Sequence, residues 1–256
     1  MAAGRQAAIV LVGHGSARHP DSAAPVLALA EALRARGPWT EVRAAFMKQE
    51  PGLEHALDGL EAAEVVVVPV FAGQGYYTDT LIPRAMGLDG AVTRRPGRLI
   101  RYTAAAGGHP RIPGVMACRA SGTATAAGMD PAATRLLLIA HGSSRPGGSG
   151  ATPRAIAEAI AAMNHFAEVA LAFLEQEPLA TGWRDLVAPG AVVVLPLLVA
   201  QGMHASQDIP PLFGLTAGQT GPVTVDGRRV VLSAGLGAEP ELVEIVAGMV
   251  TGALAG

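Results

Sequence analysis

The chain has 256 residues, of which 50% are hydrophobic and only 4% aromatic, and its formal net charge is −2. This near-neutral balance excludes a global positive field, so we expect neither nucleic acid nor a membrane as a partner. Cys118 is the only cysteine, which excludes an intramolecular disulfide and a thiolate metal cluster. No apolar run approaches the roughly 20 residues that span a bilayer, and no signal-peptide pattern opens the sequence. We therefore expect a soluble, cytoplasmic protein.

Short apolar runs alternate with longer helix-like segments along the first half of the chain. The predicted strands are residues 8–12, 42–46, 65–70 and 98–102. The predicted helices are residues 22–36, 51–60 and 78–86, and a last helix that begins near 109. Strands that alternate with helices of this length are typical of βαβ units.

The second half follows the same alternation. Its predicted strands are residues 136–139, 169–173, 192–197 and 230–233, and its predicted helices are 152–163, 178–187, 206–213 and 239–254. Continuous Val and Leu runs indicate strands that are buried on both faces of a parallel sheet. We predict an α/β fold with two tandem domains, each a small doubly wound parallel sheet flanked by helices. The domains are residues 1–125 and 134–256, with a Gly-, Ala- and Thr-rich linker at about 121–133.

The two halves are copies of one sequence. The motif G-H-G-S at residues 13–16 recurs as A-H-G-S at 140–143, and A-F-M-K-Q-E-P at 45–51 recurs as A-F-L-E-Q-E-P at 172–178. Both pairs are 127 residues apart (141 − 14 and 172 − 45). Two differences stand out, because Tyr77 is matched by His204 and Lys48 by Glu175. The second copy therefore carries a His, Glu and His set that the first copy has lost.

Three reactive side chains of the second half follow three predicted strands. His141 comes directly after the first strand, Glu175 ends the second, and His204 lies in the loop after the third. Ligands of open α/β sheets bind beyond the carboxyl ends of the strands, so these side chains can converge on one site. Two His and a Glu suit Co²⁺, Fe²⁺, Ni²⁺ or Zn²⁺, and imidazoles also suit proton abstraction near neutral pH.

Structural interpretations stand beside these functional ones. His-Gly-Ser can be a turn in which Gly allows close backbone approach and Ser caps the next helix. Glu50 and Glu177 are kept in both halves before a proline, which favours a structural role at a helix start. Arg18 and Arg145 are either solvated loop residues or partners for anionic groups. The chain has no phosphate loop and no nucleophile elbow, and no organic cofactor is expected.

Taken together, the motifs resemble the CbiX/SirB group of class II tetrapyrrole chelatases, the sirohydrochlorin cobalto- and ferrochelatases. The resemblance rests on the strand followed by His-Gly-Ser and on A-F-L-E-x-x-P at 172–178. It also rests on P-L-L…G-x-H…D-I-P at 196–210 and the closing L-G…P at 236–240. It covers nearly the whole chain, as the long, duplicated form. It implies two chelatase-like repeats and ATP-independent insertion of Co²⁺ or Fe²⁺, with Ni²⁺ also compatible, into a polycarboxylate tetrapyrrole of cobalamin or siroheme biosynthesis.

The resemblance also implies roles for individual residues. Metal ligation and proton transfer fall to His141, His204 and Glu175. Substrate binding falls to the loops around them, at Gly142, Ser143, Arg145, Gln201, Gly202, His14 and Arg18. The resemblance implies a site in the first half of long members, and Lys48 and Tyr77 depart from that pattern. We therefore expect a degenerate first-half site that helps to form the walls of a cleft between the halves.

Two other functions use the same residues. A metal or tetrapyrrole carrier would bind stoichiometrically without turnover. A hydrolase with Ser143 as nucleophile would need the elbow motif that the sequence lacks. The sequence leaves open which metal and which tetrapyrrole are used, and whether the protein is a monomer or a homodimer.

Overall fold

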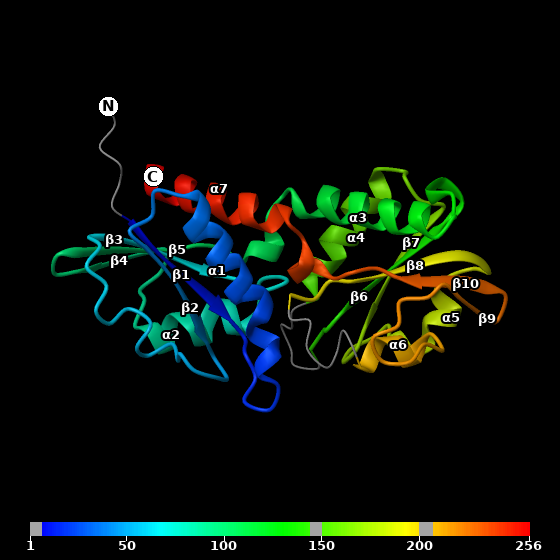
Figure 1. Cartoon of the computed structure of the whole chain (residues 1–256), viewed down its shortest axis with the longest axis horizontal. Coiled ribbons are helices and arrows are strands. Elements are labelled where there is room, and N and C mark those ends of the chain that lie inside the picture. Colours follow the sequence, from blue (N-terminus) through cyan, green and yellow to red (C-terminus); the bar gives the residue numbers. More distant parts are fainter. Residues whose placement is uncertain (1–6, 144–149, 200–206) are drawn as a thin grey trace. The chain divides into compact units, whose positions relative to one another are not determined.

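The computed structural model describes residues 7–143, 150–199 and 207–256, and these form two compact units (Figure 1). The first unit consists of Met1–His109 and Pro240–Gly256, and the second of Pro110–Glu239. Each unit contains one five-stranded sheet. The predicted α/β fold with two tandem domains is thus confirmed.

The two sheets share one strand order. The first is ordered β2-β1-β3-β5-β4 and the second β7-β6-β8-β10-β9. Only the last pair of each sheet is antiparallel, and the others are parallel. The strands are β1 (Ala7–Gly13), β2 (Glu41–Phe46), β3 (Glu64–Pro69), β4 (Val92–Arg95), β5 (Arg98–Tyr102), β6 (Arg135–Ala140), β7 (Glu168–Phe173), β8 (Gly190–Pro196), β9 (Val223–Val225) and β10 (Arg228–Leu232).

Helices cover both faces of each sheet. In the first unit α1 packs on β1 and β2 and α7 on β3, while α2 lies on the opposite face. In the second unit α3 and α4 cover one face, and α5 and α6 the other. The α-helices are α1 (Ala24–Arg36), α2 (Ile82–Met86), α3 (Ile112–Ala126), α4 (Ala151–Ala162), α5 (Trp183–Leu186), α6 (Ile209–Leu212) and α7 (Glu241–Ala255). Short helical turns are η1 (Pro20–Ala23), η2 (Tyr77–Leu81), η3 (Ala106–Gly108), η4 (Pro131–Ala133), η5 (Ala180–Gly182) and η7 (Leu236–Ala238).

The compact units differ from the sequence repeats, because each repeat contributes its last helix to the other unit. α3 follows β5 in the chain but packs against β8 and β10 of the second sheet. α7 follows β10 but packs against β3 and α1 of the first unit. Residues 121–126 belong to α3, so the linker predicted at 121–133 begins too early. Repeat boundaries in a sequence record duplication, and they do not specify which sheet an apolar helix covers.

One other predicted helix is absent, and two are shorter than predicted. Residues 51–60 form successive turns instead of a helix, because Gly59 adopts a left-handed φ of 65° and Gly52 adds backbone freedom. The predicted helix 178–187 forms over residues 180–186, where the 3₁₀ turn η5 continues directly into α5. Of the predicted helix 206–213, residue 206 lies outside the described residues and α6 forms over 209–212.

A hairpin closes each sheet, and its first strand, β4 or β9, was not among the predicted strands. β4 and β5 are joined at Pro96 and Gly97, and β9 and β10 at Asp226 and Gly227. Gly97 has φ 68°, and Asp226 and Gly227 have φ 49° and 72°. Pro-Gly and Asp-Gly are ordinary signals for two-residue turns, so the hairpins were encoded but their short polar strands were not recognised.

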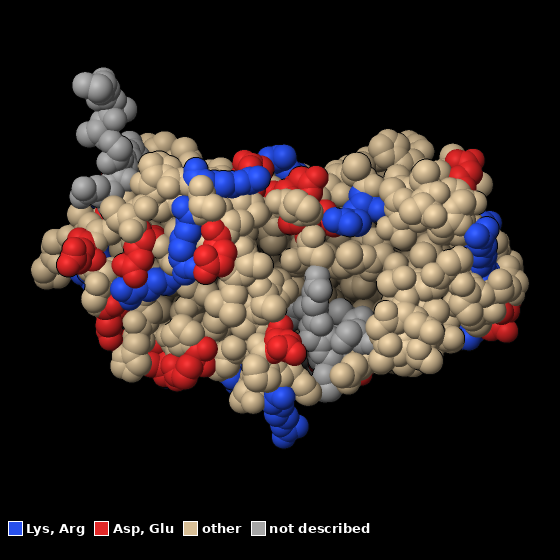
Figure 2. All heavy atoms as spheres, in the orientation of Figure 1, with Lys and Arg blue, Asp and Glu red and all other residues tan. Residues whose placement is uncertain are grey.

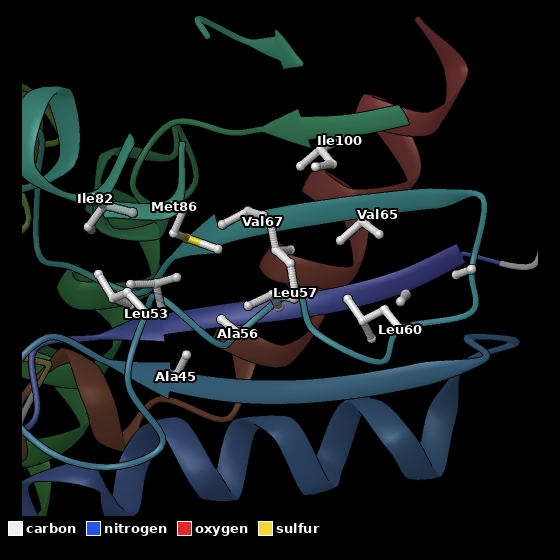
Figure 3. Packing of buried hydrophobic residues seen from close by; sticks show 14 residues of the cluster. Ala45, Leu53, Ala56, Leu57, Leu60, Val65, Val67, Ile82, Met86 and Ile100 are labelled. Atoms are coloured by element: carbon white, nitrogen blue, oxygen red, sulfur yellow. The ribbon is translucent and has the colours of Figure 1, made fainter. Parts of the chain in front are cut away.

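Alternate residues of the central strands form the core of each unit. In the first unit, one apolar cluster combines strand residues with α2 and the turns that follow β2 (Figure 3). Figure 3 shows Ile82 and Met86 of α2 and Leu53 and Leu57 of the turns near Val67 of β3. Burying such side chains contributes about 1.5–3 kcal/mol each and fixes the strand ends that carry the loops discussed below.

Charge is dispersed over the face of the molecule that Figure 2 draws. On the face drawn in Figure 2, Lys and Arg side chains are interspersed with Asp and Glu, and most of the surface carries neither. Among the helices of the described ranges, none is long and apolar enough to cross a membrane.

Two glycine positions give a matched test of the fold. A Cβ on Gly237 would lie 1.7 Å from the Val199 carbonyl oxygen, whereas a Cβ on Gly122 of α3 meets nothing within 4 Å. We expect Gly237→Ala to lower the free energy of unfolding by more than about 2 kcal/mol, because backbone must move. Gly122→Ala should raise it by about 0.5–1 kcal/mol, because a helical residue gains propensity. Urea denaturation measures both, and an unchanged midpoint for Gly237→Ala would contradict the packing of η7 on this segment.

Candidate functional site

The two His-Gly-Ser loops leave the carboxyl ends of β1 and β6, each flanked by two parallel neighbours in its sheet. His14 Nδ1 lies 2.8 Å from the carbonyl oxygen of Gly15, and His141 Nδ1 lies 3.2 Å from that of Gly142. A carbonyl only accepts hydrogen bonds, so Nδ1 carries the proton when the neutral ring donates here. The lone pair then resides on Nε2, the arrangement usual for metal-binding histidines.

Glycine is required at the second position of each motif. Gly15 has φ 66° and Gly142 has φ 76°, the left-handed region that other residues avoid. A Cβ on Gly142 would also lie 2.6 Å from Gln176 Cγ, and a Cβ on Gly15 2.7 Å from Gln49 Cγ. These contacts bring the loop after β1 against the loop after β2 in the first unit, and the loop after β6 against the loop after β7 in the second.

Two glutamines to which the sequence analysis gave no role hold these loops together. The amide of Ser16 donates to Gln49 Oε1 at 2.8 Å, and the amide of Ser143 donates to Gln176 Oε1 at 2.9 Å. The signal in the sequence was that both copies keep the same glutamine. The amide of Ser143, which the resemblance assigned to the substrate, is engaged within the protein, so a substrate carboxylate at this loop must use other donors.

In the second unit, the structure brings His141 and Glu175 together. His141 Nδ1 lies 3.7 Å from Glu175 Oε2, and the two side chains are 41% and 55% exposed. The backbone amide of Glu175 donates to the carbonyl oxygen of His141 at 2.9 Å, which continues the pairing of β6 with β7 beyond the strand ends. An imidazole ring and a carboxylate are thus held side by side, and both are open to solvent.

In the first unit, the equivalent positions also converge. The amide of Lys48, the counterpart of Glu175, donates to the carbonyl oxygen of His14 at 3.0 Å. The ring of Tyr77, the counterpart of His204, lies 5.4 Å from the His14 ring, edge to face at 89°. The loops after β1, β2 and β3 therefore meet at one place.

The remaining predicted residues divide into two groups. His204, Arg145, Gln201 and Gly202 lie outside the described residues. Arg18 is exposed in the loop after β1. Over residues 7–143, 150–199 and 207–256, no three His, Cys, Asp or Glu side chains gather as a metal site.

Glu50 and Glu177 have the structural role that the sequence indicated, in a different form. Glu50 Oε2 accepts from the amide of Gly52 at 2.8 Å, and Glu177 Oε2 from that of Leu179 at 3.1 Å. Each closes a local turn after β2 or β7, and neither caps a long helix.

Comparisons with known proteins agree on one family. The family model described as CbiX matches residues 8–123 and again 135–253. A probable sirohydrochlorin cobaltochelatase of Halobacterium salinarum is 33% identical over 262 aligned residues, covering 93% of this chain and 89% of that protein.

Solved structures share the fold. DR2241 of Deinococcus radiodurans, a multi-domain protein with structural similarity to chelatases, superposes with a TM-score of 0.78 at 30% identity over 96% of this chain. This chain spans 54% of that protein. SirB of Bacillus subtilis, solved with Fe³⁺, superposes with a TM-score of 0.72 at 21% identity over 98% of this chain and 96% of that one, which supports the fold alone.

The glutamine contacts predict paired effects in the two units. Gln176→Ala removes the acceptor of the Ser143 amide and should cost about 1 kcal/mol of unfolding free energy. It should also shift the imidazole resonances of His141 and leave those of His14 unchanged. Gln49→Ala is the matched control and should shift the imidazole resonances of His14 while leaving those of His141 unchanged. Histidine-detected ¹H–¹⁵N NMR reads both rings, and a Gln176→Ala spectrum without a His141 shift would contradict the positioning role.

Proposed function

The chain belongs to the CbiX family, and we propose that it is a chelatase that inserts Co²⁺ or Fe²⁺ into sirohydrochlorin or a related polycarboxylate tetrapyrrole without ATP. The similarity to the probable sirohydrochlorin cobaltochelatase of Halobacterium salinarum supports this activity. If the ion is cobalt the product belongs to cobalamin synthesis, and if it is iron to siroheme synthesis.

The observation that carries the proposal is the His141–Glu175 pair at the ends of β6 and β7. Imidazole nitrogen and carboxylate oxygen are ligands that cobalt, iron and nickel all accept. Both side chains remain about half exposed, so an ion can enter and leave. A chelatase needs such an incomplete ligand set, because it must surrender the ion to the macrocycle.

We assign His204 as the third ligand. The support comes from the first unit, where the matching residue Tyr77 lies beside His14 on a scaffold with the same strand order. We also assign Arg145, Gln201, Gly202 and Gly142 to substrate binding, because they lie in the same loops of the sequence as His141 and His204. Arginine suits the peripheral carboxylates of the substrate because its guanidinium can bind them bidentately.

The side chains of the site must accept protons from the macrocycle during this reaction. A free tetrapyrrole loses two pyrrole N–H protons when a dication enters, so each cycle needs proton acceptors beside the ring nitrogens. His141, His204 and Glu175 are assigned this role, because imidazole and carboxylate exchange protons readily near neutral pH. The hydrogen bond from His141 Nδ1 to the Gly142 carbonyl oxygen favours the tautomer whose Nε2 lone pair is available to an ion.

Insertion assays test the proposal directly. Under anaerobic conditions, Co²⁺ and Fe²⁺ are offered with sirohydrochlorin, and turnover is followed by absorbance. We expect His204→Ala and Glu175→Gln to lower the insertion rate at least about 100-fold, because each removes a ligand and proton acceptor. His165→Ala, an exposed histidine of the same unit, is the matched control and should keep the wild-type rate.

The outcomes separate a chelatase from a carrier. Multiple turnovers that only the two site variants abolish would support the chelatase, and the relative rates would identify the preferred metal. Stoichiometric binding without insertion above the spontaneous rate would overturn it in favour of a carrier.

A further inference from the structure

Four rings gather at the carboxyl edge of the first sheet, and we call them the ring cluster: His14, Phe71, Tyr76 and Tyr77. The rings of Phe71 and Tyr77 are 6.4 Å apart and inclined by only 26°. His14 stands edge-on to Tyr77 at 5.4 Å and to Phe71 at 6.5 Å, and Tyr76 lies 6.5 Å from Tyr77. Such edge-to-face and offset contacts stabilise each ring in its place.

Three rings of the cluster are exposed, those of His14, Tyr76 and Tyr77, and Phe71 is partly buried, in a protein that otherwise has few aromatic residues. The chain contains five Phe, three Tyr and two Trp, and one Phe and two Tyr are in this cluster. Tyr76 is 51% exposed and Tyr77 40%. Their counterparts in the second half are Met203 and His204, and that of Phe71 is Leu198. The first copy therefore has two tyrosines and a phenylalanine where the second has methionine, histidine and leucine.

Two cations accompany the rings. Lys48 follows β2 and is joined through its amide to His14, and Arg18 lies in the same loop as His14. Both are exposed, and neither side chain makes an ion pair or hydrogen bond with a described residue. Acids lie nearby as well: Asp79 accepts from Gln74 Nε2 at 3.0 Å and from Thr78 Oγ1 at 3.1 Å, and Asp21 and Glu50 are exposed. The edge therefore carries both signs of charge, and Lys48 and Arg18 are the groups that can pair with an anionic ligand.

The backbone under Tyr77 is held rigidly. Tyr102 Oη donates to the carbonyl oxygen of Thr78 at 2.7 Å, and Thr78 is buried. Burial raises the pKa of Tyr102, which keeps its hydroxyl protonated as a donor. Thr78 Oγ1 also contacts the amide and the carbonyl of Gly75 at 2.9 Å each. A surface preorganised in this way loses little conformational entropy on binding.

From these observations we propose that the first unit binds the metal-free, carboxylate-bearing tetrapyrrole at the ring cluster and does not bind the metal. The flat macrocycle stacks on the exposed tyrosine rings, and its carboxylates pair with Lys48 and Arg18. The ammonium group of Lys48 repels a divalent ion at the place where Glu175 attracts one. The inference rests on the proposed function, because it takes the substrate of the second unit as the ligand of the first.

Binding without metal tests this site separately from catalysis. Metal-free sirohydrochlorin is titrated into the full chain by equilibrium dialysis, with absorbance as the readout. We expect Tyr77→Leu combined with Lys48→Glu to remove one macrocycle per chain, or to weaken its binding about tenfold or more. The conservative pair Tyr77→Phe with Lys48→Arg should retain it, because ring and charge are kept. Leu27→Ala, at another exposed apolar position, controls for surface truncation.

The two proposals fail in different ways. Equal binding by wild type and Tyr77→Leu/Lys48→Glu, or no binding at all, would overturn the first-unit site even if insertion proceeds. Loss of insertion in Glu175→Gln with the Tyr77-dependent binding unchanged would support both. If the double variant loses binding but wild type shows no insertion, the first-unit site stands and the chelatase proposal fails.

Discussion

The conformation of the His-Gly-Ser loops after β1 and β6 depends on one constraint. In each loop a glycine in the left-handed region packs against a glutamine that follows the neighbouring strand. Gly142 can adopt φ 76° and let Gln176 approach, and Gln176 then fixes the amide of Ser143. This arrangement turns the chain sharply at the end of β6 and leaves His141 beside Glu175. Gly15 and Gln49 repeat it in the first unit. The chemistry of either site depends on this turn, because the turn sets where the imidazole lies.

The same scaffold carries different chemistry in its two copies. Backbone contacts hold the strand-end positions, so their side chains can change without loss of the fold. The first unit keeps its histidine but adds a lysine, two exposed tyrosines and a phenylalanine, which favours a flat anion. The second unit keeps the carboxylate beside its histidine, which favours a cation. Duplication followed by divergence thus accounts for two copies of one fold whose strand ends carry different side chains.

Much of the fold could be predicted from the sequence, because its central strands are continuous apolar runs and its repeat is nearly unbroken. The residues of the His141–Glu175 pair were identifiable from their difference between copies and from their position after adjacent strands. The sequence could not predict that α3 packs on the second sheet and α7 on the first. Both helices are apolar enough to cover either sheet. The contacts of Gln49 and Gln176 could not be predicted, because a polar loop residue that both copies keep does not reveal which group it binds.

The central claim is that the metal site lies in the second unit alone. Anomalous scattering from crystals soaked with Co²⁺ tests it most directly, because the peaks locate the ion without any assumption about activity. The account predicts a peak about 2.0–2.1 Å from a ring nitrogen of His141, with a carboxylate oxygen of Glu175 as a second ligand, and no peak at His14. A peak at His14, or no ordered cobalt beside His141, would contradict it.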